Sequence, residues 1–312
     1  VQGYATVGTI ASFVNYSRQF SRPVNQIASL YNATQSAIAG AERVFELMDE
    51  PEESNPVEEE GISETFQALR GSVAFEGVSF SYVEQKPVLL DISFRAASGE
   101  TIAIIGPTGS GKTTLINLLA RFYDPDAGTI EVDGVSILNR KRQSLRSRIG
   151  VVLQDTWLFS ASVMENIRYG RLDATDEEVM AAARMANAES FIHRMPQGYE
   201  TPLSEEGSNL SQGQRQMIAI ARAILANPEI LILDEATSNV DTRTEVAIQS
   251  AMRSLMQGRT SFVIAHRLRT IINADRILVV HNGRIIESGT HSELLGKKGF
   301  YFDLYTRQFD AS

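Results

Sequence analysis

One short run combines the residue types that bind phosphate. It starts at Gly106, ends Gly-Lys-Thr at Thr113, and has the spacing G-x-x-x-x-G-K-[ST]. Residues 101–105 before it form a predicted buried strand, and residues 112–121 after it form a predicted helix. Glycines let backbone N–H groups turn toward phosphate oxygens, and the helix N-terminus adds partial positive charge. The residues predicted to bind the nucleotide are the run itself, Gly106, Pro107, Thr108, Gly109, Ser110, Gly111, Lys112 and Thr113, together with the next residue, Thr114.

The side chains at the end of this run extend the prediction to a metal ion. Lys112 would neutralise the terminal phosphate oxygens, and the Thr113 hydroxyl would bind Mg²⁺. The alternative is a glycine-rich turn with a surface lysine. That alternative does not explain why strand, loop, Lys-Thr pair and helix occur in the required order, so we favour the phosphate site.

Two carboxylates follow a second predicted buried strand, residues 230–233. They are Asp234 and Glu235, and carboxylates at such a position are costly unless they have a function. Asp234 would hold Mg²⁺ through water, and Glu235 could reach a water in line with the γ-phosphate. An acid that caps a helix is the alternative, and the phosphate-binding run makes it the weaker one.

A third motif reads Asn209-Leu-Ser-Gln-Gly-Gln and precedes a predicted amphipathic helix. Ser211 followed three residues later by Gln214 is a capping box, so an ordinary helix start explains much of it. The three motifs in this order nevertheless resemble those of the ATP-binding cassette (ABC) family, whose signature LSGGQ stands here as LSQGQ. The resemblance covers residues 71–312.

The resemblance implies ATP and Mg²⁺ as ligands and a second cassette as partner. In the family, two cassettes pair head to tail, and each signature faces the γ-phosphate held by the other cassette. Ser211, Gly213 and Gln214 would then contact ATP in trans, because a helix end offers free N–H groups. Gln212 stands where the signature has glycine. This departure favours an asymmetric heterodimer, with a tolerated variant in a homodimer as the alternative.

Four more residues match family positions, and each has a structural alternative. Tyr82 resembles the aromatic residue that stacks on adenine, or is a strand aromatic. Gln154 resembles the glutamine that reaches Mg²⁺ and the attacking water, or is a strand-end amide. His266 resembles the switch histidine at the γ-phosphate, or is structural. Asp241 matches the loop that crosses the dimer interface, or caps the next helix. The implied catalytic residues are Glu235, His266 and Gln154, and the implied metal ligands are Thr113, Gln154 and Asp234.

Alternating short strands and helices must position these side chains. Apolar runs at residues 149–153, 230–233 and 261–264 are each followed by a loop or helix, which predicts a mostly parallel sheet covered by helices. β-rich runs at 72–75, 78–82 and 88–94 precede the phosphate site. We expect an α/β P-loop NTPase fold with an antiparallel β subdomain, a helical subdomain inserted at about 160–226, and a long helix before it.

The organisation of the chain suggests three parts. Residues 1–50 are predicted to be helical, 51–70 an acidic linker and 71–312 the nucleotide-binding domain. Residues 1–17 carry no charge but include several polar residues, so an ordinary amphipathic helix and the inner end of a membrane helix lining a polar cavity both fit. The chain opens at Val1 and not at methionine, so we expect a piece of a longer protein.

The first fifty residues resemble the inner end and cytoplasmic extension of the last membrane helix of ABC exporters, notably at Arg22-Pro23 and at residues 41–49. Residues 204–208 resemble the exporter loop that contacts the coupling helices of the membrane domain. The resemblance thus implies half of a bacterial multidrug-type exporter. The domain would lie at the cytoplasmic face of the cell (inner) membrane.

Composition excludes several other classes of protein. The 312 residues include no cysteine, which rules out disulfides, thiolate zinc sites and a cysteine nucleophile. The net charge is −9, and seven acidic residues between 49 and 60 account for most of it. The remainder is nearly neutral and has no broad basic face, so nucleic acid is not an expected partner.

Three functions compete on this sequence. We favour an ATP-hydrolysing exporter domain that dimerises around two ATP molecules. A chromosome-maintenance ATPase would separate the motifs by a long coiled coil, but Lys112 and Asp234 are only 122 residues apart. A regulatory module that binds nucleotide with little turnover is the remaining alternative, and it would need neither Glu235 nor His266.

Overall fold

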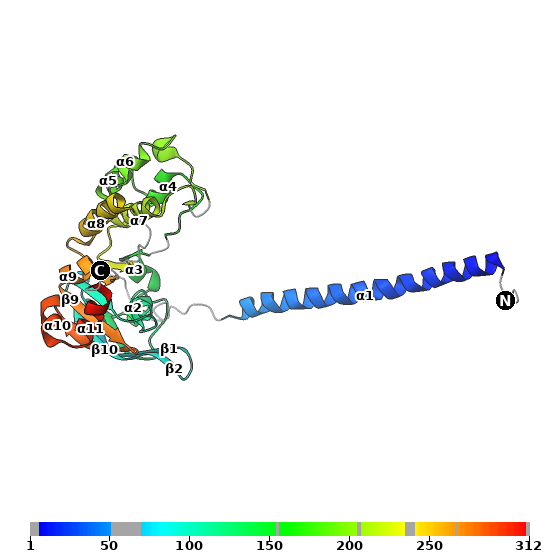
Figure 1. Cartoon of the computed structure of the whole chain (residues 1–312), viewed down its shortest axis with the longest axis horizontal. Coiled ribbons are helices and arrows are strands. Elements are labelled where there is room, and N and C mark those ends of the chain that lie inside the picture. The colour runs from blue at the N-terminus through cyan, green and yellow to red at the C-terminus, as the bar shows by residue number, and fades with distance from the viewer. Residues whose placement is uncertain are drawn as a thin grey trace. The chain divides into compact units, whose positions relative to one another are not determined.

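The computed structural model describes residues 6–50, 70–153, 156–204, 207–234, 241–265 and 268–309. Its contacts divide the chain into two compact units, Val1–Ser54 and Asn55–Ser312 (Figure 1).

The first unit contains one continuous helix, α1, from Val7 to Asp49. Thr6 caps it, because its side chain accepts a hydrogen bond from the Thr9 backbone N–H at 3.3 Å. The helix runs through most of residues 1–50, which the sequence predicts to be helical, and it includes Pro23. Among the described residues, no helix combines the length and the apolar character needed to cross a membrane.

The second unit is built on a six-stranded sheet in the order β10-β9-β3-β8-β7-β6. Five of its strands are parallel, and β10 joins β9 antiparallel at one edge. The mostly parallel core predicted from the apolar runs is therefore confirmed. The strands are β3 (Thr101–Ile105), β6 (Ile149–Val152), β7 (Ile230–Asp234), β8 (Thr260–Ile264), β9 (Arg276–His281) and β10 (Arg284–Gly289).

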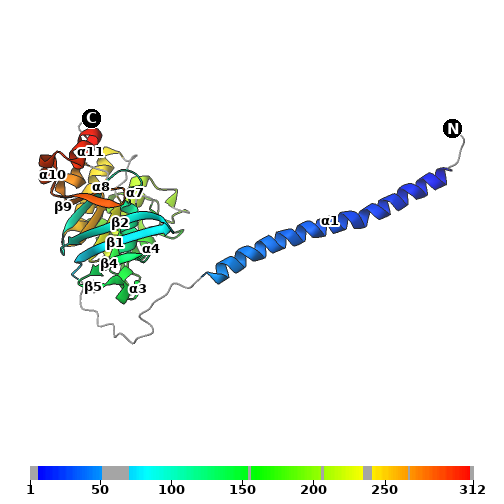
Figure 2. The ribbon, with the colours of Figure 1, turned by 90° about the horizontal axis from the view of Figure 1, so that it is seen from below.

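A second, antiparallel sheet has the order β2-β1-β4-β5, and Figure 2 shows β2, β1 and β4 side by side. The two β-rich runs expected at 72–75 and 78–82 form one strand, because a register shift between Phe75 and Val78 lets pairing continue past the irregularity. The antiparallel β subdomain is confirmed. Its strands are β1 (Val73–Val83), β2 (Lys86–Ala96), β4 (Ala127–Val132) and β5 (Val135–Ser136).

Helices cover the sheets and form the predicted insertion. Figure 1 shows α4, α5 and α6 together at one end of the second unit, with β1 and β2 at the other. The insertion between β6 and β7 comprises α4 (Val163–Arg168), α5 (Asp176–Met185), α6 (Glu189–Ile192), η3 (Gly198–Glu200) and α7 (Gln212–Ala226). The others are α2 (Lys112–Leu119), η2 (Ile137–Asn139), α3 (Arg142–Arg146), α8 (Thr242–Met256), α9 (Leu268–Asn273), α10 (His291–Lys297) and α11 (Phe300–Phe309).

Aromatic packing joins the two sheets. Phe75 stacks on Phe94 across β1 and β2 with ring centroids 4.7 Å apart, and Phe94 meets Phe262 of β8 edge to face at 6.2 Å. All three rings are buried in a core that also contains apolar residues of α2. A second core lies under the helical insertion and includes Leu231 and Leu233 of β7. The insertion and the sheet therefore share buried surface.

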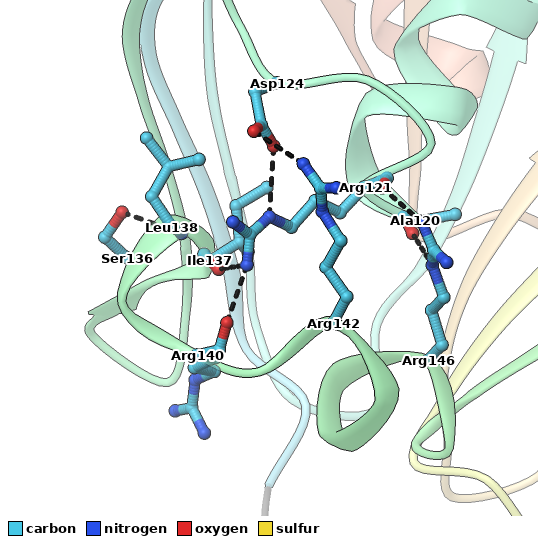
Figure 3. Close-up of polar contacts among 9 residues, drawn as sticks. All are labelled: Ala120, Arg121, Asp124, Ser136, Ile137, Leu138, Arg140, Arg142 and Arg146. Atoms are coloured by element: carbon cyan, nitrogen blue, oxygen red, sulfur yellow. Dashed lines mark hydrogen bonds and ion pairs between the residues drawn. The ribbon is translucent and has the colours of Figure 1, made fainter. Parts of the chain in front are cut away.

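A cluster of arginines, which the sequence analysis did not identify, joins α2 to the segment before β6 (Figure 3). Arg121 is fully buried. Its Nε donates to Asp124 Oδ1 at 3.0 Å, and its Nη1 donates to the carbonyls of Ile137 and Arg140 at 2.7 and 2.6 Å. Arg142 Nη2 donates to the other oxygen of Asp124 at 2.7 Å. One carboxylate thus holds two guanidinium groups from different segments.

Arg146 completes this cluster from α3. Its Nη2 donates to the carbonyl of Arg121 at 2.7 Å, and its Nε donates to the carbonyl of Ala120 at 3.3 Å. A cation at the C-terminus of α2 satisfies carbonyls that the helix leaves free and opposes the negative end of the helix dipole. The helix that begins at the phosphate loop is therefore fixed at its far end.

Candidate functional site

Four neighbouring parallel strands end at the same edge of the core sheet. The phosphate-binding run follows β3, and the next strands in the sheet are β8, β7 and β6. Asp234 closes β7 opposite Ile264 of β8. With neighbouring strands about 4.8 Å apart, Asp234 is about 10 Å across the sheet from β3. Ligands of open parallel sheets bind beyond this carboxyl edge, so the fold brings the phosphate loop and Asp234 to one site.

Lys112 closes the phosphate loop on itself. Its Nζ donates to the carbonyls of Gly106 and Pro107 at 2.8 and 2.9 Å. Only 9% of the residue is exposed. Burial lowers the pKa of the Lys112 ammonium, and attraction to Asp234 partly offsets that shift. The cation is therefore held inside the loop by two of the loop's own carbonyls.

The backbone of the loop fits a bound anion. Gly106 has φ +153°, and a Cβ there would lie 2.0 Å from the carbonyl oxygen of Val280, so no side chain fits. Ser110 is buried, and its Oγ has no hydrogen-bond partner in the described part of the chain. A buried hydroxyl in that state has room for a hydrogen bond to a water, an ion or a ligand oxygen. Pro107, Thr108 and Gly109 form the exposed rim of the loop.

Of the three predicted metal ligands, the structure describes Thr113 and Asp234. Thr113 is the second residue of α2 and is exposed, and Asp234 is partly exposed at the strand end. A hydroxyl and a carboxylate are ligands that Mg²⁺ accepts together with phosphate oxygens. Gln154, Glu235 and His266 lie outside the described residues. Each of them follows a described residue at the carboxyl edge: Leu153, Asp234 and Ala265.

Tyr82 lies at the end of β1 against the first turns of α2. Its hydroxyl donates to Thr114 Oγ1 at 3.2 Å and accepts from Asn117 Nδ2 at 3.4 Å. Its ring meets Phe80 and Tyr123 edge to face, with centroids 4.9 and 5.0 Å away, and the residue is 46% exposed. The ring is thus fixed beside the phosphate loop with much of its surface free. The hydrogen bond from Asn117 had no signal in the sequence.

The third motif starts α7 with the expected capping box. Ser211 Oγ accepts from the Gln214 N–H at 3.3 Å, and Gln214 Oε1 accepts from the Ser211 N–H at 2.9 Å. Two of the four N–H groups that a helix start leaves open are thereby used, and those of Gln212 and Gly213 remain outside the intrahelical bonds. Gly213 is buried. The motif is therefore an ordinary capped helix start, and it still leaves the N–H groups of Gln212 and Gly213 as donors for an anion.

Asp241 is the N-cap of α8. Its Oδ1 accepts from the Thr244 N–H at 3.0 Å. This bond and others from the same turn lower the pKa of Asp241, so the side chain is an anion at neutral pH. Within one chain, Asp241 thus caps the helix α8. Its predicted place at a dimer interface concerns a second chain and stays a prediction.

Comparison with known proteins agrees with this geometry. The sequence profile of the family described as "ABC transporter" matches residues 89–238. An uncharacterized ABC transporter ATP-binding protein of Bacillus subtilis, YfiC, is 54% identical over 310 residues, which cover 99% of this chain and 51% of that protein. A fatty acid ABC transporter ATP-binding/permease protein of Mycobacterium bovis is 54% identical over 302 residues, which cover 97% of this chain and 47% of that protein.

A solved structure extends the similarity to three dimensions. It is described as a bacterial Atm1-family ABC exporter with ATP bound, with a TM-score of 0.79 and 41% identity. The similarity covers 99% of this chain and 53% of the exporter chain. This chain spans about half the length of the relatives it matches. With its phosphate loop, strand-end aspartate and inserted helical subdomain, the chain belongs to the ABC transporter family.

Proposed function

We propose that this chain is the ATP-binding and ATP-hydrolysing domain of an ABC exporter. One observation carries the proposal: the fold places the buried Lys112 ammonium and the Asp234 carboxylate at one sheet edge, close enough for Asp234 to affect the pKa of Lys112. Phosphoryl transfer uses a cation that binds the phosphate oxygens and a carboxylate that holds Mg²⁺ through water. Lys112 and Asp234 would supply these two groups. The proposed ligands are ATP and Mg²⁺.

The residues of the loop would exchange their present partners for phosphate. Lys112 would release the carbonyls of Gly106 and Pro107 and donate to terminal phosphate oxygens. Ser110 Oγ would gain the partner it lacks. Thr113, Gln154 and Asp234 would hold Mg²⁺, which would supply positive charge for the phosphates. We assign Glu235 as the base that takes a proton from the attacking water, and His266 as a contact of the γ-phosphate.

A second cassette would complete each site. The free N–H groups at the start of α7, together with Ser211, suit the γ-phosphate bound by a partner cassette, and the anionic Asp241 would lie at that interface. ATP would then hold two cassettes together, and hydrolysis would let them separate.

We propose the same division of the chain that the sequence suggests: residues 1–50 as the end of the last membrane helix with its cytoplasmic extension, 51–70 as a linker and 71–312 as the ATP-binding domain. The relatives' names include ATP-binding/permease proteins, which supports a membrane part beyond this chain. The domain would act at the cytoplasmic face of the membrane, with the coupling helices of the membrane part as partners. Nucleic acid is not a proposed partner.

Tyr82→Ala tests the adenine contact. We expect ATP binding to weaken by about 1–3 kcal/mol, the range for stacking of a base on an aromatic ring. Calorimetry with ATP measures this loss, and a thermal melt run in parallel measures the fold. Tyr82→Phe is the matched control, because it removes only the hydroxyl bonds to Thr114 and Asn117. A lower melting temperature with unchanged ATP affinity would show that Tyr82 is only a packing residue.

Gln212→Gly tests the proposed preference for a heterodimer. If Gln212 impairs the partner's ATP site, glycine should raise the ATPase rate of the chain alone severalfold at concentrations that saturate dimerisation. The reason is that the Gln212 side chain extends from the first residue of α7, next to the donors that face the phosphate. An unchanged rate would remove this argument and favour a homodimer with a tolerated LSQGQ signature.

The alternative function is a regulatory module that binds ATP without turnover. It would keep the phosphate loop, Tyr82 and the capped start of α7, and it would release no phosphate. A direct phosphate-release assay therefore separates the two functions.

A further inference from the structure

Three aromatic residues form an exposed patch on the helical insertion, and we refer to Trp157, Phe159 and Tyr169 as the aromatic patch. They are 56%, 41% and 57% exposed. The rings of Phe159 and Tyr169 lie 4.7 Å apart although ten residues separate them. The rings of Phe159 and Tyr169 are thus in contact with each other while much of their surface stays exposed.

Arg222 of α7 lies against both rings. Its guanidinium carbon lies 5.6 Å from the centroid of Phe159 and 5.3 Å from that of Tyr169. Its Nη1 donates to the carbonyl of Trp157 at 3.2 Å. Its Nε and Nη2 donate to the carbonyl and the Oδ1 of Asn166 at 2.9 and 3.1 Å. One side chain of α7 therefore contacts all three residues of the patch.

Asn166 makes this contact rigid. The residue is fully buried. Besides accepting from Arg222, its Oδ1 accepts from the Phe159 N–H at 2.9 Å, and its Nδ2 donates to the Phe159 and Ser162 carbonyls at 3.0 Å. A fully hydrogen-bonded buried amide has few alternative positions. The loop that carries Trp157 and Phe159 is thus fixed to the same guanidinium that holds Tyr169.

The backbone of α7 and the loop before it also pack closely against the segments that carry the aromatic patch. A Cβ at Gly170 would lie 2.2 Å from the carbonyl oxygen of Arg222, so the turn after Tyr169 rests directly on the helix. At the other end, Arg215 Nη1 donates to the carbonyl of Leu210 at 2.8 Å. A Cβ at Gly207 would lie 2.9 Å from Leu158, so the loop before α7 also contacts the patch loop. The patch is attached near both ends of α7.

Helix geometry then connects the patch to the signature. Arg222 is eleven residues after Ser211, which is about three turns and about 16 Å along α7, on the same side of the helix. We propose that Arg222 is a positioning residue that couples the aromatic patch to the Ser211 end of α7. The inference rests on the proposed function, in which Ser211 meets a bound γ-phosphate. A partner that displaces the patch would move Ser211, and by reciprocity ATP at Ser211 would displace the patch.

Trp157 reports this coupling directly, since it is the only tryptophan of the chain. With the 312-residue chain at concentrations that saturate dimerisation, we expect ATP·Mg²⁺ to change the emission of Trp157. Arg222→Lys keeps the charge but loses the planar fork and the ring contacts. We expect this variant to bind ATP with unchanged affinity by calorimetry and to lose most of the emission change.

Two further variants control the test. Arg184→Lys makes the same substitution at an exposed arginine of α5 and should keep the full emission change. Tyr169→Leu removes one ring from the guanidinium, leaves its hydrogen bonds in place, and should reduce the change by less than Arg222→Lys does. If Arg222→Lys melts at a much lower temperature than the unmodified chain, Tyr169→Leu tests the coupling in its place. A full emission change in Tyr169→Leu would then contradict the coupling.

Each other outcome overturns the coupling. A full emission change in Arg222→Lys would mean that the signal reaches Trp157 along the chain from Gln154 and not through α7. No emission change in the unmodified chain while ATP binds would mean that patch and signature are independent. Loss of ATP affinity in Arg222→Lys would give Arg222 a role in the nucleotide site or the fold. Failure of the unmodified chain to bind ATP by calorimetry would instead refute the proposed function.

Discussion

Glu235→Gln is expected to lower the ATPase rate by about 10²–10⁴-fold, the contribution of a positioned general base. The amide has the size of the carboxylate but cannot take a proton from water, so ATP affinity should be retained. Because hydrolysis is what would reopen the dimer, the variant should accumulate as a closed dimer with ATP. Phosphate release measures the rate, and sedimentation with ATP·Mg²⁺ measures the dimer.

Glu229→Gln is the matched control. Glu229 lies just before the other end of β7 and pairs with Arg148 at 2.7 Å, away from the carboxyl edge. The Glu229→Gln chain should hydrolyse ATP at close to the rate of the unmodified chain. A Glu235→Gln chain with near-normal turnover would remove Glu235 from the role of base and leave the attacking water to another group.

Arg121→Met should destabilise the second unit by about 3 kcal/mol or more, the lower end of the cost of removing one partner from a buried ion pair. The lower end applies because the Asp124 side chain is 38% exposed and can be partly hydrated. Methionine fills similar volume but leaves the carbonyls of Ile137 and Arg140 without their donor. For a unit of this size we expect the melting temperature to fall by about 6–12 °C.

Arg95→Met provides the comparison at an exposed pair. Arg95 and Glu76 have 77% and 48% of their side chains exposed, and such pairs contribute at most about 1 kcal/mol. If Arg121→Met melts within a degree or two of Arg95→Met, the arginine cluster of Figure 3 is not what fixes the far end of α2.

Local patterns predicted the fold class well because its elements have strong signals. The apolar runs became β6, β7 and β8, and the phosphate-binding run lies between β3 and α2 as its glycines require. The strands of the antiparallel sheet were predicted less accurately. A register shift after Phe75 is a matter of pairing with a distant strand, so two short runs could not be recognised as one strand.

The candidate site shows the same division. The capping box of Ser211 and Gln214 was predicted, since it is local in sequence. The bonds from Lys112 to the carbonyls of Gly106 and Pro107 were not predicted. The burial of Arg121 and the placement of Arg222 over two rings depend on residues far along the chain. Basic residues are usually exposed, so composition argues against both placements. The roles of Gln154, Glu235 and His266 stay predictions.

The most direct test of the account is phosphate release from ATP·Mg²⁺ measured over a range of chain concentrations. A site completed in trans requires two chains, so the rate per chain should rise with concentration and reach a plateau. Glu235→Gln should lower that rate by about 10²–10⁴-fold at every concentration. A chain that binds ATP but releases no phosphate at any concentration would contradict turnover, and a rate per chain independent of concentration would contradict the head-to-tail dimer.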